Sequence, residues 1–203
     1  DTARRAENLI RAGLVADKKG WGQASYSYGG FFRQELYSGN RHYSTLRLQQ
    51  YRFDLFAEGN FLESTTPFET TRFSRPKVDF SKSFFQKDTA GTDKLLLKVG
   101  FYGERERNER RSGDSDTLNM ASFWYDLFKL YFQTPEQAGR VRWGGFASRR
   151  LDFFPTENMF VQNTTGDELN INGAWTARDR PNAARQNLLW NITYRRLAST
   201  TRN

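Results

Sequence analysis

The chain lacks cysteine, which excludes disulfides, zinc ribbons and thiol catalysis. It has one histidine, His42, in a turn-like context, with no second histidine to complete a metal site or a catalytic triad. No apolar run approaches the roughly 18 residues of a membrane-spanning helix. Signatures of phosphate loops, dinucleotide binding, serine hydrolases and zinc proteases are missing as well. These absences argue against an enzyme and against any cofactor.

The spacing of the acidic residues does not favour a catalytic pair or a metal site. Asp54 and Glu58 would share one side of a strand about 13 Å apart, which is too far for a glycosidase pair. Asp114 and Asp116 give the only hint of a calcium loop, but the terminal glutamate of the EF-hand pattern is missing. We therefore expect no catalytic residues and no metal site.

What the chain does have is aromatic residues and positive charge. Aromatic side chains make up 16% of its 203 residues although the mean hydropathy is -0.81, so large rings alternate with polar groups, as on pleated sheets with one apolar side. The net charge is +8, but no basic run reaches five residues. We expect solvated or lumen-facing charge, and nucleic acid is an unlikely partner.

The N-terminal region suggests a helix. In residues 1–20, Ala6, Leu9, Ile10 and Leu14 share one helical face, and Gly20 is a suitable stop. The sequence thus predicts a short amphipathic helix over residues 1–20 and an antiparallel β domain, or a segment of a barrel, over residues 21–203.

From Trp21 onward the hydrophobic period is two. About eight amphipathic strands joined by neighbouring loops predict an all-β antiparallel meander, closed as a barrel or forming part of one. Residues 43–50 are expected to continue into the strand through Tyr51, with a bulge near Gln49 and Gln50. Turn composition predicts a turn at residues 37–42, a loop at residues 63–76 and a flexible charged tip at residues 105–116. Residues 117–133 fit strand or helix, and their strand neighbours favour strand.

The two sides of the predicted strands differ sharply in chemistry. The apolar side carries aromatic residues that we expect to face a membrane: Tyr51, Phe53, Phe101, Trp143, Trp175, Trp190 and Tyr194. The polar side carries charges that we expect to line a lumen: Arg52, Asp54, Glu58, Lys94, Lys98, Glu104, Arg142 and Arg150.

Several stretches resemble the strands and turns of very large outer-membrane β-barrel proteins of Bacteroidota-type Gram-negative bacteria. They are "YSGNRHYSTLRLQQYRF", "SRPKVDFSKSF", "SDTLN", "YFQTPEQAGRVRWGGFASRRLDFFP" and "LLWNITYRRL". The resemblance implies an outer-membrane location, contacts with outer-membrane lipid or lipopolysaccharide, and a structural, transport or assembly role beside other envelope proteins. It carries no catalytic residues. The chain is far shorter than such proteins and richer in arginine, so we expect an internal segment of one.

Two other hypotheses remain. A soluble β-barrel or sandwich that binds a glycan, lipid or anionic polymer would show the same alternation, because an antiparallel sheet with one wet face also alternates. An enzyme would require two acidic side chains that converge in a cleft of the fold.

Overall fold

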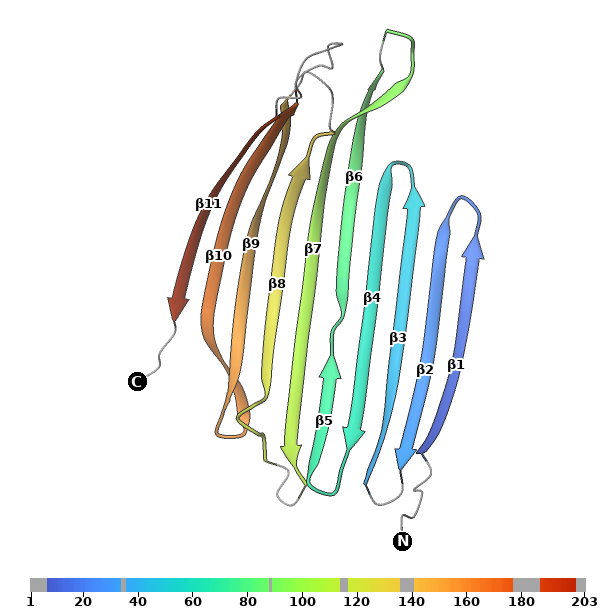
Figure 1. Cartoon of the computed structure of the whole chain (residues 1–203), viewed down its shortest axis with the longest axis vertical. Coiled ribbons are helices and arrows are strands. Elements are labelled where there is room, and N and C mark those ends of the chain that lie inside the picture. Colours follow the sequence, from blue (N-terminus) through green and yellow to red (C-terminus); the bar gives the residue numbers. More distant parts are fainter. Residues whose placement is uncertain are drawn as a thin grey trace.

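The computed structural model is a single-layer antiparallel sheet of eleven strands (Figure 1). It describes residues 7–33, 36–87, 89–113, 117–135, 141–176 and 187–199. The strands are β1 (Glu7–Lys18), β2 (Gly22–Arg33), β3 (Tyr37–Gln50), β4 (Phe53–Thr65), β5 (Glu69–Ser74), β6 (Lys77–Lys87), β7 (Asp93–Ser112), β8 (Phe123–Gln133), β9 (Val141–Thr156), β10 (Met159–Thr176) and β11 (Asn187–Ser199). The predicted all-β meander is confirmed.

Each strand pairs with its neighbour in sequence, except around β5 and β6. These two short strands follow one another in the same position between β4 and β7, because Pro76 interrupts them. Proline has no N–H to give to a ladder. Backbone bonds span the break: Arg75 N–H donates to Asn60 O at 2.8 Å, and Arg105 N–H donates to Pro76 O at 3.1 Å. The sheet therefore has ten strand positions and continues across the interruption.

The predicted N-terminal helix is wrong where the structure describes it, because residues 7–18 form the edge strand β1. The even positions of this segment carry apolar residues such as Ile10 and Leu14, whereas Arg11 and Asp17 lie at odd positions. A hydrophobic period of two, typical of a strand, was therefore present beside the helical pattern. The described residues contain no helix that is long and apolar enough to cross a membrane.

Strand length was also underestimated, and three strands were missed: β1 was predicted as a helix, β5 as a loop, and β3 with β4 as one strand. Residues 37–42 begin β3, residues 63–65 and 69–74 belong to β4 and β5, and residues 105–112 continue β7. The ambiguous stretch resolves as strand β8. In these segments both faces of the strand carry polar residues, so the sequence shows no alternation of apolar and polar positions. By composition alone they therefore resemble loops.

Two tight turns connect β3 to β4 and β9 to β10. Tyr51 and Arg52 have φ of 48° and 70°, and Glu157 and Asn158 have φ of 49° and 65°. Positive φ at both central residues is typical of the type I′ turn, whose twist suits a hairpin. Residues 43–50 thus belong to β3, and the chain reverses at Tyr51 and Arg52 before β4; the predicted bulged continuation into one strand is wrong.

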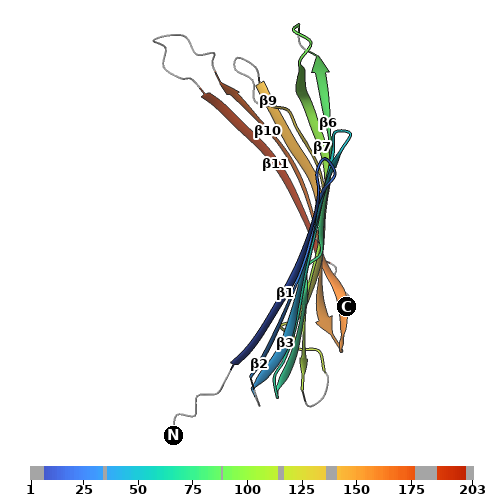
Figure 2. The same ribbon diagram turned by 90° about the vertical axis from the view of Figure 1, so that its right-hand side faces the viewer.

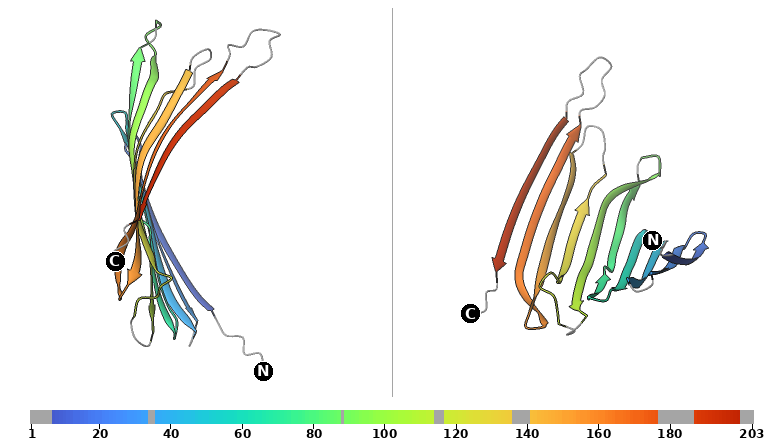
Figure 3. Two further views of the ribbon diagram at one scale, coloured as in Figure 1. Left: turned by 90° about the vertical axis from the view of Figure 1, so that its left-hand side faces the viewer. Right: turned by 60° about the horizontal axis from the view of Figure 1, so that its bottom comes forward.

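The sheet is strongly twisted, and the part of the chain that the structure describes adds no second layer to it. In Figures 2 and 3 the lower end of β1 and the upper end of β11 swing toward the same side. The accessible surface is 15009 Å², whereas a compact monomer of this mass exposes about 9,800 Å². Leu118 is the only large apolar side chain buried among the described residues. The sheet therefore lacks a hydrophobic core of its own.

Candidate functional site

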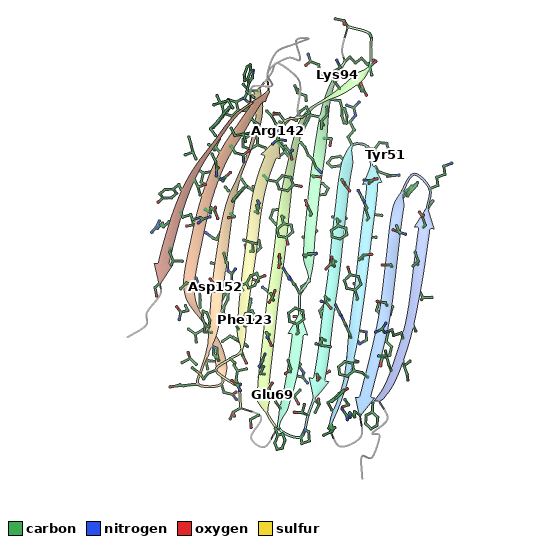
Figure 4. All side chains as sticks on the ribbon, in the orientation of Figure 1. Tyr51, Glu69, Lys94, Phe123, Arg142 and Asp152 are labelled. Carbon is green, nitrogen blue, oxygen red and sulfur yellow. The ribbon has the colours of Figure 1, made fainter. Side chains whose placement is uncertain are left out.

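The pairing register divides the strands into two faces, because directly paired residues point to the same side of a sheet. We call the face that carries Trp190 face A and the opposite one face B. Side chains project from both faces of the single layer (Figure 4). Neither face is covered by another part of the described chain.

Face A carries a continuous belt of apolar side chains that crosses every strand position. We call it the apolar belt; its larger members are Ile10, Leu14, Tyr26, Tyr28, Phe32, Leu46, Leu48, Phe53, Leu55, Phe61, Val78, Phe80, Phe84, Leu97, Val99, Phe101, Phe128, Leu130, Phe132, Val141, Trp143, Leu169, Ile171, Trp175, Leu188, Trp190, Ile192 and Tyr194. Many are widely exposed, including Leu14 at 76% and Leu188 at 60%. A contiguous exposed apolar surface of this size is typical of a contact with another protein or with lipid.

Six of the seven predicted membrane-facing aromatics lie in this belt: Phe53, Phe101, Trp143, Trp175, Trp190 and Tyr194. Tyr51 does not, because it occupies the turn at the top of the β3–β4 hairpin (Figure 4), where 86% of its surface is exposed.

Glycines in the belt are covered by aromatic rings. A Cβ on Gly173 would overlap the indole of Trp190, which lies directly opposite on β11. Gly145 of β9 pairs directly with Phe132 of β8, and a Cβ on Gly145 would lie 2.9 Å from the Phe132 ring. Trp190 also meets Trp143 edge to face at 5.3 Å between ring centroids. Rings from neighbouring strands thus fill the gaps that these glycines leave.

Face B is polar. Of the predicted lumen-facing charges, it carries Asp54, Glu58, Lys98, Glu104, Arg142 and Arg150, and Figure 4 shows Arg142 near the upper end of β9.

Two of the predicted lumen-facing charges lie elsewhere. Arg52 is in the β3–β4 turn, although its guanidinium reaches Asp93 at 2.9 Å. Lys94 shares face A with Phe84, because a bulge opposite Phe85 shifts the alternation of β7 by one residue.

Several polar groups of face B form hydrogen bonds with one another. Glu104, whose side chain is 5% exposed, accepts hydrogen bonds from Arg75 Nε at 2.6 Å, from Tyr125 at 2.8 Å and from Tyr102. Tyr131 donates to Asp79 at 2.6 Å. An asparagine ladder links β10 to β11, with Asn170 Nδ2 donating to Asn191 at 2.6 Å and to Thr193 at 2.8 Å, and Asn172 donating to Asn170 at 3.0 Å.

The lower boundary of the apolar belt runs diagonally across the strands. On β10 the first charged residue below the belt is Asp167, whereas on β4 it is Glu63. The residue of β4 in the same cross-strand row as Asp167 is Ala57, reached through the pairs of β9, β8, β7 and β6. Between β10 and β4, which are five strand spacings (about 24 Å) apart, the boundary therefore shifts along the strands by the six residues from Ala57 to Glu63 (about 20 Å). This shift corresponds to strands that are tilted by about 40° from the normal to the boundary.

The same diagonal is the direction in which the sheet curls. In Figure 1, β7 runs downward and β6 lies to its right; the N–H of Arg105 points to that side, where it bonds to Pro76. In a strand of L-amino acids, the direction of the chain and the direction of a residue's N–H together fix the face to which its side chain points. Here the Arg105 side chain, and with it face A, points away from the viewer of Figure 1. The corners of β1 and β11 curl toward the viewer of Figure 1 (Figures 2 and 3). Face B is therefore the concave side along the belt, and face A is the convex side.

Ion pairs border the apolar belt on face A. Arg149 pairs with Asp167 at 2.7 Å and Arg105 with Asp126 at 2.6 Å, both within the first charged rows. Farther down β7, Glu109 binds Arg107 and Arg111, each at 2.6 Å. Burial opposes ionisation of Glu109, but the hydrogen bond from Arg111 and the charges of both arginines outweigh it and lower the pKa of the carboxyl group.

A second aromatic cluster lies below the charged rows of face A. Trp124 stacks on Phe153 at 4.3 Å between ring centroids and meets Phe160 edge to face. The guanidinium groups of Arg105 and Arg107 lie over Trp124 at 4.9 and 5.9 Å. This cluster and the contribution of β1 to the belt were not predicted from the sequence. Period two in residues 9–17 was the available signal for the latter.

No metal-binding cluster occurs among the described residues, and the hinted calcium ligands Asp114 and Asp116 lie outside them. No protein-family model, curated protein or solved structure matches the chain. The chemistry of the two faces of the sheet is therefore the basis for assigning a function.

Proposed function

We propose that this chain is a non-enzymatic wall segment of a transmembrane β-barrel in a Gram-negative outer membrane, with a structural, transport or assembly role in an envelope complex. The apolar belt of face A contacts lipid, and face B lines a polar lumen. The main observation behind this proposal is the diagonal lower boundary of the apolar belt. When tilted strands cross a planar membrane, the membrane surface intersects neighbouring strands at successively shifted residues, which produces such a diagonal. A tilt of about 40° lies within the 35–45° range of outer-membrane barrels.

The curvature and the missing core support the same proposal. Face B is concave along the belt, so closing the sheet in that direction places the polar face inside. Phe53 to Phe61 span nine residues of β4, about the length that crosses a bilayer as a tilted strand. Lys82 lies near the upper edge of the belt, with its ammonium 4.7 Å from the Phe53 ring, where a long side chain reaches the interface.

The proposal implies partners at each boundary of the sheet. Lipid or lipopolysaccharide contacts the belt and its bordering ion pairs. The free edges of β1 and β11 pair with other strands of the complete barrel, because unpaired backbone groups are not tolerated in lipid. The resemblance to large Bacteroidota-type barrels agrees with a segment of this kind.

A pair of adjacent substitutions on β10 tests this function. Ile171 lies on face A within the belt, and Asn172 lies on face B. In a full-length parent barrel, Ile171→Arg is expected to reduce outer-membrane assembly strongly, since a charge in the hydrocarbon region costs about 2–4 kcal/mol. Asn172→Arg adds the same charge to the lumen and is expected to assemble normally. Assembly is measured by resistance to carbonate extraction and by heat-modifiable gel migration.

The result of this comparison decides between lipid and a protein core. Equal assembly of the two variants would contradict contact of face A with lipid. A clean soluble monomer of the isolated chain would also contradict it, and would favour a soluble sheet that binds its ligand through the aromatic face.

A further inference from the structure

A hollow of about 620 Å³ lies on face B over β1, β2, β3 and β4. Arg11 and Arg41 stand on either side of it, and Phe31, Tyr43 and Leu62 supply its apolar lining. It is separate from the Glu104 network, which lies on β7 and its neighbours.

The register brings the two arginines to the same glycine. Gly29 of β2 pairs with Arg11 on β1 and with Arg41 on β3, so all three residues point to face B in one row. Two strand spacings separate the arginine Cα atoms by about 10 Å. A Cβ on Gly29 would meet no atom within 4 Å, so the floor between the two arginines is open.

The charge in this hollow is one-sided. Among the described residues, no acidic side chain lines it, whereas arginines elsewhere on face B contact carboxylates, such as Arg75 with Glu104 and Arg150 with Asp152. Arg41 Nε donates to the side-chain oxygen of Asn60 at 3.1 Å, a neutral acceptor that orients the guanidinium without cancelling its charge. Two guanidinium groups across an open floor suit a phosphate or carboxylate group.

The apolar lining selects among anions. Phe31, Tyr43 and Leu62 are half-buried. Leu62 lies in the arginine row, directly opposite Arg41, and Phe31 and Tyr43 lie in the rows on either side of it. An inorganic ion would leave these side chains without a partner, whereas an aromatic or aliphatic group attached to the anion would cover them.

We propose that this hollow binds an organic anion, with a phosphate or carboxylate group between Arg11 and Arg41 and an apolar group against Phe31, Tyr43 and Leu62. The site does not depend on which medium contacts face A. Its test is made in detergent solution, so its failure and a failure of membrane assembly are separate results.

The site is tested by titrating the full-length parent protein, refolded in a nonionic detergent, with phenyl phosphate and measuring the heat of binding by calorimetry. Arg11→Gln and Arg41→Gln are each expected to weaken binding at least tenfold, since each removes a charge-assisted hydrogen bond. Gly29→Leu is expected to abolish binding by filling the floor, and its fold should persist because that space is open. Inorganic phosphate and phenyl glucoside are expected to bind at least tenfold more weakly than phenyl phosphate.

Arg150→Gln is the matched control, because it removes a face B arginine that already has a carboxylate partner. It should leave the affinity unchanged. Three results would overturn the proposal: undiminished binding by Gly29→Leu, an equal loss in Arg150→Gln, or equal affinity for inorganic phosphate. Gly29→Leu keeps the test decisive should an arginine variant fail to refold.

Discussion

At the residue scale, the glycines of the apolar belt depend on rings from adjacent strands. Trp190 occupies the space over Gly173 that a side chain would need, whereas the nearest atom to a Cβ on Gly166 of the same strand would be Leu197 Cδ1 at 3.9 Å. The same substitution therefore has opposite consequences at two positions of β10.

Gly173→Ala is expected to destabilise the refolded protein by about 1–3 kcal/mol, because the added methyl group displaces the indole of Trp190. Gly166→Ala is expected to be neutral or slightly stabilising, since alanine loses less backbone entropy in a strand. Urea unfolding in detergent micelles, followed by tryptophan fluorescence, measures both. Equal stability of the two variants would show that Trp190 does not depend on Gly173.

The lowered pKa of Glu109 makes part of the stability dependent on pH. A carboxyl group whose pKa is lower in the folded state contributes stability above its unfolded pKa of about 4.3. That contribution is lost as the pH falls from there through the folded pKa. Glu109→Gln is expected to destabilise the protein at pH 7 and to flatten its acid-induced loss of stability. Unfolding midpoints measured from pH 7 to pH 3 check this, and an unchanged acid slope would contradict it.

At the element scale, the two type I′ turns adopt positive φ without glycine. Replacing Tyr51–Arg52 by Asn–Gly is expected to stabilise the hairpin by about 0.5–1 kcal/mol, because these residues tolerate that geometry. The gain should be smaller for the same replacement at Glu157–Asn158, because Asn158 Oδ1 accepts a hydrogen bond from Leu118 N–H at 2.6 Å. Denaturant midpoints of the two variants measure the difference. A loss of stability at Tyr51–Arg52 would count against the turn assignment.

The elements that the sequence predicted well are those with strong chemical contrast between their faces. Ile171 against Asn172, and Trp190 against Asn191, mark β10 and β11 without ambiguity. Residues 9–14 satisfy helical and strand periods together, and only pairing with β2 decides between them. Residues 105–112 carry charge on both faces, so alternation is invisible there. Lys94 could not be placed because a bulge leaves no clear signal in composition.

At the whole-molecule scale, the tilt of the strands is measurable. The diagonal boundary predicts that the strands of the assembled barrel lie about 40° from the membrane normal. Polarised infrared spectroscopy of the full-length parent barrel in aligned bilayers reports this angle through the amide I dichroism. An angle outside roughly 35–45° would contradict the placement of the boundary at Asp167 and Glu63.

The sheet buries almost no large apolar side chain of its own. Its folding therefore depends on whether the chain has reached the partner that covers face A. Until face A meets its apolar neighbour, the chain gains little from the hydrophobic effect and exposes a surface prone to aggregation. Translation can finish long before the native pairing becomes favourable. If face A contacts lipid as we propose, the strands need a carrier that shields them in transit, and the chain folds only when it reaches the membrane.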